Sequence, residues 1–283
     1  MGDQHELTLR DGLKLHLEIS ERGHNDWIVF THGIGEHCGR HRYLLNRYCN
    51  RFNIALYDLR GHGASEGKRT KIHSFNDYID DLRELLEFLE RDYRMESGRF
   101  ILYGHSMGAL IVSTFVQRVK LNYFAPLKVI LSGPPVVPGN LLGKLLASIP
   151  TTTKYLAKYW IDLPLRGLVD LHYLSHDTRI YEEYMQDPKN VLAASSHLLL
   201  NLIHTACEVY SRPLGLRQAN IPLAVVLGSE DKIIDVLAAR KYFSSVEIAS
   251  ELLVIKDAYH ELHNEIERYR EEYFTFIDHF ISS

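Results

Sequence analysis

Six short apolar runs constrain the fold of this chain more than any other feature. They cover residues 27–30, 53–57, 100–103, 127–131, 223–227 and 252–255, and helical patterns lie between most of them. Such runs are typical of strands that are buried on both faces of a sheet. Alternation of these strands with helices predicts a mostly parallel central sheet covered by helices on both faces. We therefore expect an α/β fold.

Other patterns add detail to this sheet. Residues 5–9 and 13–20 alternate in polarity around Asp11-Gly12, as a β-hairpin does. Apolar residues recur at a spacing of three to four over 74–93, which predicts an amphipathic helix with Ser74 and Asp77 as a capping box. A last helical pattern covers about 264–281.

The alternation stops between residues 134 and 205. This 134–205 segment contains helix-like pieces and no convincing strand. A pause of this length in a strand–helix rhythm predicts an inserted helical cap over one end of the sheet. We expect residues 1–133 and 206–283 to form one α/β core that carries this cap.

Composition and charge exclude several classes of protein. The chain has 283 residues, an ordinary share of apolar and charged residues and a formal net charge of −4, so no nucleic-acid partner is expected. Cys38, Cys49 and Cys207 lack metal or disulfide spacing. We find no signal-peptide pattern and no apolar stretch that could span a bilayer, and therefore expect a soluble, cytoplasmic protein. The oligomeric state is left open.

One serine stands between two glycines where a strand pattern changes to a helix pattern. Gly104-His105-Ser106-Met107-Gly108 follows the apolar run 100–103 directly. G-x-S-x-G alone is a weak signal, because serine is also a common helix N-cap. Its position between a buried strand and a helix favours a nucleophile elbow, in which glycines permit a sharp turn that exposes the hydroxyl. Ser106 is therefore the candidate nucleophile.

A serine hydroxyl needs a base to remove its proton. In a sheet of this kind an acid and then a histidine follow the nucleophile along the chain, each after a later strand. The run 223–227 leads to Asp231 and the run 252–255 leads to His260, so the three side chains should meet at one edge of the sheet. The alternatives are Glu230 and Asp235 for the acid, and His263 and His279 for the base. His24, His41 and His105 need no functional explanation.

The negative charge of a tetrahedral intermediate needs hydrogen-bond donors. The run 27–30 is followed by His32-Gly33-Ile34-Gly35-Glu36-His37, and the two glycines allow a turn that directs the Ile34 amide at the site. The amide of Met107, just after the nucleophile, would be the second donor. Without the elbow, the same segment would be interpreted as a plain strand-exit turn. This set of groups requires neither a metal ion nor an organic cofactor.

These motifs together resemble the monoacylglycerol lipase and lysophospholipase family of α/β-hydrolases. The resemblance covers nearly the whole chain in order, through HGIGEH with Gly39-Arg40, DLRGHGASEG at 58–67, GHSMG at 104–108, GSED at 228–231 and Ala258-Tyr259-His260. Ala109 departs from the family, which usually has another glycine there. The resemblance implies an α/β-hydrolase fold, and it implies that Glu36, Arg40 and His263 face the polar end of the substrate.

The expected function is that of a serine esterase acting on lipid esters, with monoacylglycerol as the first choice of substrate. Ser106 would attack the ester, His260 would transfer the proton, and Asp231 would orient His260. Lysophospholipids, other carboxylic esters and thioesters remain alternatives. A non-catalytic binding protein of the same fold is the alternative from a different class.

The 134–205 segment also carries a possible membrane contact. Five apolar residues fall on one face of a short predicted helix, namely Leu141, Leu142, Leu145, Leu146 and Ile149. They could pack against the sheet, or they could form a lid that rests transiently on a membrane and makes the protein peripheral there. Lys144 lies beside this face, and Lys154, Lys158 and Arg166 make this half of the cap basic, which would weakly favour anionic lipid.

Overall fold

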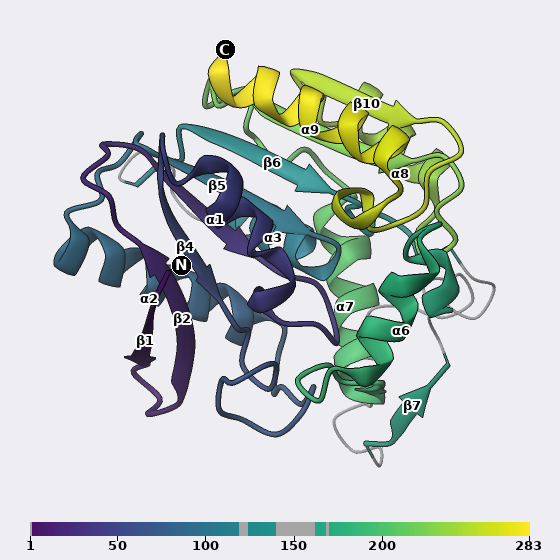
Figure 1. The fold of residues 1–283 in the computed structure, drawn as a ribbon, viewed down its shortest axis with the longest axis horizontal. Coiled ribbons are helices and arrows are strands. Elements are labelled where there is room, and N and C mark those ends of the chain that lie inside the picture. Colours follow the sequence, from purple (N-terminus) through teal and green to yellow (C-terminus); the bar gives the residue numbers. More distant parts are fainter. Residues whose placement is uncertain (1, 119–123, 140–161, 168–169) are drawn as a thin grey trace.

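A mixed sheet of eight strands forms the centre of the molecule (Figure 1). The computed structural model describes residues 2–118, 124–139, 162–167 and 170–283. The strands are β1 (Asp3–Thr8), β2 (Lys14–Ser20), β3 (Trp27–Thr31), β4 (Asn53–Tyr57), β5 (Phe100–His105), β6 (Lys128–Ser132), β9 (Leu223–Gly228) and β10 (Glu251–Ile255). Their order across the sheet is β1-β2-β4-β3-β5-β6-β9-β10. The β1–β2 and β2–β4 pairs are antiparallel, and all other neighbours are parallel.

Helices cover both faces of this sheet. The longer ones are α1 (Tyr43–Tyr48), α2 (Asn76–Tyr93), α3 (Met107–Arg118), α6 (Thr178–Gln186), α7 (Ser196–Val209), α8 (Val236–Ser245) and α9 (Glu267–Ser282), and the short 3₁₀ turns are η1 (Cys38–His41), η3 (Leu171–Tyr173) and η4 (Leu262–Asn264). One apolar core contains residues of α2, α3, α7 and α8, and the other contains residues of α1 and α9. The mostly parallel sheet covered by helices on both faces, which the sequence predicted, is therefore confirmed.

The alternation of β3 between the two cores explains why its sequence is apolar throughout. Trp27 and Val29 belong to the core under α2 and α3, whereas Ile28 and Phe30 belong to the core under α1 and α9. All four side chains are buried. A strand covered on both faces has no polar side, so its sequence loses the period of two that a half-exposed strand shows.

The start of α2 differs from the predicted capping box. Asp77 accepts a hydrogen bond from the Ser74 amide, as a capping box requires. However, the Ser74 hydroxyl accepts from the Asn76 amide at 3.2 Å, and the helix begins at Asn76 with no side-chain cap on Phe75. A capping box with Ser74 as the N-cap would start the helix at Phe75, so the observed helix begins one residue later than predicted.

The sequence of the 134–205 segment shows no convincing strand, but the structure has two short ones there. β7 (Pro164–Arg166) pairs with β8 (Ala193–Ser195) in a small antiparallel sheet. Three residues are too few to show an alternating pattern, and this explains the difference. Figure 1 shows α6 and β7 on the side towards which the arrows of β5 and β6 point. Among the described helices, none has the length and hydropathy needed to cross a bilayer.

Candidate active site

Ser106 lies at a sharp turn between β5 and α3. Its φ of +51° is in the left-handed region, which is unusual for a residue with a side chain. The turn depends on close packing of glycine, because a Cβ atom on Gly108 would lie 2.0 Å from the carbonyl oxygen of Thr31. Ala109, which replaces the usual glycine, is accommodated fully buried in α3. This geometry is that of a nucleophile elbow.

The carboxyl ends of three strands bring Ser106, His260 and Asp231 together. The Nε2 atom of His260 lies 2.9 Å from the Ser106 hydroxyl oxygen. The Nδ1 atom of the same ring lies 2.5 Å from an Asp231 carboxylate oxygen. The other Asp231 oxygen accepts the amides of Ile233 and Ile234, which fixes the carboxylate. The side chains therefore form a continuous hydrogen-bonded row.

The structure gives other positions to the alternative acids and to His263. Glu230 is exposed and pairs with Lys232. Asp235 caps α8 by accepting the Ala238 amide. His263 is buried in η4, where its ring stacks on Tyr43 at 5.1 Å between centroids. Of the two neighbouring histidines, it is His260 that reaches the serine.

The environment of His260 favours its protonated form. Burial lowers the pKa of the ring, but the nearby Asp231, Glu261 and Glu36 carboxylates outweigh this effect and raise the pKa above its ordinary value. A histidine in this environment is a competent proton acceptor once it is neutral.

The residues that follow β3 form a turn beside the serine, which we call the oxyanion turn (residues 32–37). The Leu59 amide donates to His32 Nε2 at 2.9 Å, which ties the start of this turn to the loop after β4. Ile34 lies in the turn and lines the cavity above Ser106. Met107 is the first residue of α3, and the first amides of a helix have no acceptor within the helix. Both predicted oxyanion donors are thus close to the serine in the fold.

A cavity of about 520 Å³ opens over Ser106. Its apolar wall comes mainly from the 134–205 segment and includes Leu165, Leu171, Leu174, Met185, Leu192 and Leu199. Its polar part contains Glu36, His105 and Glu261 beside Ser106 and His260. An apolar wall with a few polar groups at one end is typical of a site for a small molecule with an apolar chain.

Of the three residues assigned to the polar end by resemblance, Glu36 alone is among the described residues that line the cavity. Arg40 lies behind it, where it donates to Glu261 at 2.6 Å and approaches Glu36 at 3.4 Å. His263 lies behind His105, with 5.1 Å between ring centroids. Arg40 and His263 therefore support the polar end from beneath.

Glu261 and His41 were missed from the sequence. Glu261 lines the cavity and holds Arg40, and His41 bonds to Glu36 at 2.9 Å. The position of Glu261 next to His260 was the one available signal for it. No pattern in the sequence distinguishes His41 from the histidines on the surface.

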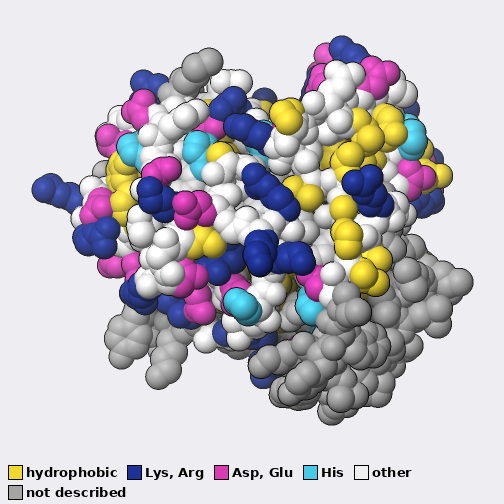
Figure 2. Space-filling view, turned by 90° about the horizontal axis from the view of Figure 1, so that it is seen from below, with side chains coloured by type: hydrophobic (Ala, Val, Ile, Leu, Met, Phe, Trp, Pro, Cys, Tyr) yellow, Lys and Arg dark blue, Asp and Glu magenta, His cyan; other side chains and the backbone are white. Residues whose placement is uncertain are grey.

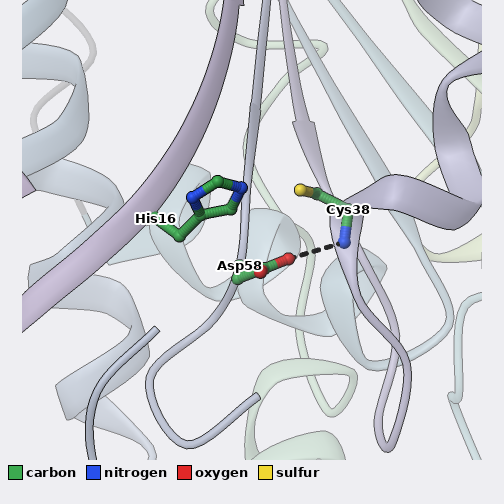
Figure 3. A group of neighbouring side chains, drawn as sticks. All are labelled: His16, Cys38 and Asp58. Atoms are coloured by element: carbon green, nitrogen blue, oxygen red, sulfur yellow. Dashed lines mark hydrogen bonds between the residues drawn. The ribbon is translucent and has the colours of Figure 1, made fainter. Parts of the chain in front are cut away.

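Among the residues that the structure describes, one group of side chains away from this cavity has the chemistry of a metal site. His16, Cys38 and Asp58 each offer a ligand atom, and these atoms lie within 4.8 Å of one another (Figure 3). Both Asp58 oxygens already accept backbone amides, one from Cys38 and one from Ala64, each at 2.7 Å. Burial and the Asp58 carboxylate raise the pKa of the Cys38 thiol well above its ordinary value. We interpret Asp58 as a tie between the loop after β4 and η1.

Comparison with known families assigns the chain. Residues 23–267 match the model of a hydrolase family described as serine aminopeptidase, S33. The chain belongs to this family of α/β-hydrolases. The matched range includes Ser106, Asp231 and His260 and all strands from β3 to β10.

Relatives within this family include lipases. The chain is 30% identical over 250 residues to a monoacylglycerol lipase of Mycolicibacterium smegmatis, which covers 85% of this chain and 83% of the relative. It is 27% identical over 266 residues to the monoglyceride lipase of Homo sapiens. This match covers 90% of this chain and 82% of the relative.

Solved structures show the same fold. A monoacylglycerol lipase of Paleococcus ferrophilus superposes with a TM-score of 0.76 at 23% identity, over 95% of this chain and 98% of that one. A soluble variant of the monoglyceride lipase of Saccharomyces cerevisiae, in complex with a substrate analogue, superposes with a TM-score of 0.77 at 20% identity. The superposition covers 100% of this chain and 94% of that one.

Proposed function

We propose that the protein hydrolyses monoacylglycerols to a fatty acid and glycerol through an acyl-enzyme on Ser106. The observation that carries this proposal is the hydrogen-bonded row Ser106–His260–Asp231 at the base of a largely apolar cavity. The lipase names of the relatives supply the substrate class. A non-catalytic binding protein would have no use for such a row, which makes that alternative the weaker one.

The reaction follows from the positions of these groups. His260 Nε2 takes the hydroxyl proton while the Ser106 oxygen attacks the ester carbonyl carbon. The Ile34 and Met107 amides would stabilise the oxyanion of the tetrahedral intermediate. This intermediate then expels glycerol, whose oxygen receives the proton from His260. A water molecule attacks the acyl-enzyme in the same way, the fatty acid leaves, and the proton returns to Ser106. Asp231 holds the ring in the required tautomer throughout, and no step uses a metal or an organic cofactor.

We place the acyl chain against the leucine-rich wall and the glycerol at the end of the cavity that contains Glu36 and Glu261. Neutral hydroxyls can donate hydrogen bonds to these carboxylates. Arg40 balances one of these two carboxylates, so the phosphate of a lysophospholipid would still meet a net negative charge there, which disfavours it. Monoacylglycerol is therefore the first choice and lysophospholipid the second.

We further propose that the 134–205 segment acts as a cap that also touches membranes. Leu163, Met185 and Leu192 are exposed large apolar side chains of its described part. Figure 2 shows apolar side chains gathered beside the atoms drawn in grey, with Lys and Arg side chains among them. Leu141, Leu142, Lys144, Leu145, Leu146, Ile149, Lys154 and Lys158, on which the lid was predicted, lie outside the described residues.

The experiment that tests the substrate compares kcat/KM for monoacylglycerol, diacylglycerol and lysophosphatidylcholine of equal acyl length in one detergent. Proline p-nitroanilide is included because the family is described by a peptidase name. We expect the highest value for monoacylglycerol, and loss of all activity in Ser106→Ala. A preference for the lysophospholipid or the anilide would contradict the proposal that monoacylglycerol is the substrate. Activity that persists in Ser106→Ala would contradict the proposed role of Ser106 as the nucleophile.

A further inference from the structure

We propose that Glu36 is a positioning residue that fixes the shape of the oxyanion turn. This inference rests on the proposed function, since it concerns the turn that would hold the oxyanion. Both oxygens of the Glu36 carboxylate accept hydrogen bonds from the protein itself. One accepts the Gly33 amide at 2.5 Å, and the other accepts His41 Nε2 at 2.9 Å.

The bond to Gly33 acts on the donor next to it. Gly33 immediately precedes Ile34, so the orientation of the Gly33 backbone determines where the Ile34 amide points. A Cβ atom on Gly33 would lie 3.2 Å from Ser106 Cβ and 2.8 Å from the Glu36 carboxylate. The turn is therefore packed tightly against both the serine and this carboxylate. If the carboxylate is removed, the Gly33 amide loses its hydrogen-bond acceptor and the turn loses one of the groups packed against it.

The surroundings of Glu36 keep its charge in place. The side chain is 3% exposed, and the Arg40 guanidinium approaches the oxygen that bonds to His41 at 3.4 Å. Burial alone would favour the neutral acid, but His41, His105 and Arg40 outweigh burial and hold the pKa of Glu36 well below its usual range. An ionised carboxylate accepts a stronger hydrogen bond from an amide than a neutral group does.

A contact with the substrate head group is the competing role, because Glu36 also lines the cavity. The two roles differ in which substrates they affect. A positioning residue changes the transition state of every ester, whereas a head-group contact changes only esters that carry the glycerol hydroxyls. A p-nitrophenyl ester with the same acyl chain as the monoacylglycerol separates them, since its leaving group has no such hydroxyls.

The test measures kcat and KM of Glu36→Ala, Glu36→Asp and Glu36→Gln on both substrates. We expect Glu36→Ala to lower kcat on each substrate by about 10- to 100-fold, somewhat less than the loss of an oxyanion donor itself, with little change in KM. Glu36→Asp should also lose kcat, since its carboxylate is drawn back from Gly33. Glu36→Gln keeps one oxygen for the Gly33 amide but loses the charge and the second acceptor, so it should recover part of the rate.

The rate of Ser106 phosphonylation by a fluorophosphonate gives a readout that is independent of the ester substrate. It should fall in Glu36→Ala and recover in part in Glu36→Gln. Glu18→Ala is the matched control for Glu36→Ala, because Glu18 is also a buried carboxylate, bonded to Arg42, and does not line the cavity. Its melting temperature should fall while kcat stays the same, which separates a loss of stability from a loss of positioning.

The outcomes distinguish this inference from the proposed function. A loss confined to monoacylglycerol, or an unchanged phosphonylation rate in Glu36→Ala, would overturn the positioning role. If the wild type rejects monoacylglycerol but cleaves the p-nitrophenyl ester, the substrate proposal fails and the Glu36 comparison still stands. A wild type that neither cleaves esters nor reacts with the fluorophosphonate would contradict both. If Glu36→Ala does not fold, the contrast between the Asp and Gln variants decides.

Discussion

His37 Nε2 lies 2.8 Å from an Asp187 carboxylate oxygen, and this contact joins the oxyanion turn to the end of α6. The Val191 amide donates to the Gly35 carbonyl oxygen at 2.7 Å a few residues further on. The turn beside Ser106 is therefore bonded to the 134–205 segment at two points. Whatever moves this part of the segment also moves the turn.

We predict that Asp187→Ala lowers kcat by about 3- to 10-fold, because one of the two ties is lost and the turn gains freedom. The free energy of unfolding should change by less than about 1 kcal/mol, since this pair is partly exposed. Steady-state kinetics and thermal melting measure the two effects. Glu182→Ala, an exposed acid on the same helix, is the control. Equal kinetic effects of the two variants would rule out a specific tie.

A second prediction compares two variants of the nucleophile. Neither Ser106→Ala nor Ser106→Gly has a hydroxyl, so both should lose activity by orders of magnitude and should not react with a fluorophosphonate. They should differ in stability, because φ at this position is +51° and alanine keeps the Cβ that this conformation disfavours. We expect Ser106→Gly to be more stable than Ser106→Ala by about 1 kcal/mol in denaturant unfolding. A less stable glycine variant would show that the elbow is not strained.

The pH dependence of kcat/KM should report the raised pKa of His260. The ring must be neutral to accept the serine proton, so activity is lost as the pH falls through its pKa, which lies above the ordinary value of 6.5. Asp231→Asn removes the nearest carboxylate, so the acidic limb of the profile should move to lower pH and the maximal rate should fall. An acidic limb that moves to higher pH in this variant would contradict the pairing.

The two neighbouring histidines should behave differently when replaced. His260→Ala should abolish turnover and Ser106 labelling together, because the base is lost. His263→Ala should keep the labelling and lose stability by about 1 to 3 kcal/mol, since a buried ring stacked on Tyr43 is removed. Activity-based labelling at a temperature where both variants are folded measures the difference. Loss of labelling in His263→Ala would assign it a direct catalytic role.

The sequence predicted most of the sheet because burial on both faces leaves a strong local signal. The apolar runs 27–30 and 223–227 became β3 and β9 with little change at their ends. The row Ser106–Asp231–His260 could be predicted because each member directly follows a strand or lies a few residues beyond it, and parallel strands end at one edge.

The support beneath the site could not be predicted in this way. The ion pair of Arg40 and Glu261 joins residues that are 221 positions apart, and neither lies in a periodic pattern. The hydrogen bond that the Gly33 amide donates to Glu36 depends on how one turn closes and packs beside Ser106. Local sequence rules describe propensity and period, and these contacts follow from neither.

The order of strands across the sheet has a consequence for how the protein is made. β9 lies next to β6 and β10 lies next to β9, but the ribosome must synthesise the whole 134–205 segment between β6 and β9 before these two strands can dock. Ser106 and His260 are 154 residues apart, so a nascent chain exposes its serine long before the base exists. Until then β6 is an open sheet edge, where aggregation or chaperone binding competes with docking. Reactivity of Ser106 would thus report when His260 of a newly made chain has docked beside it.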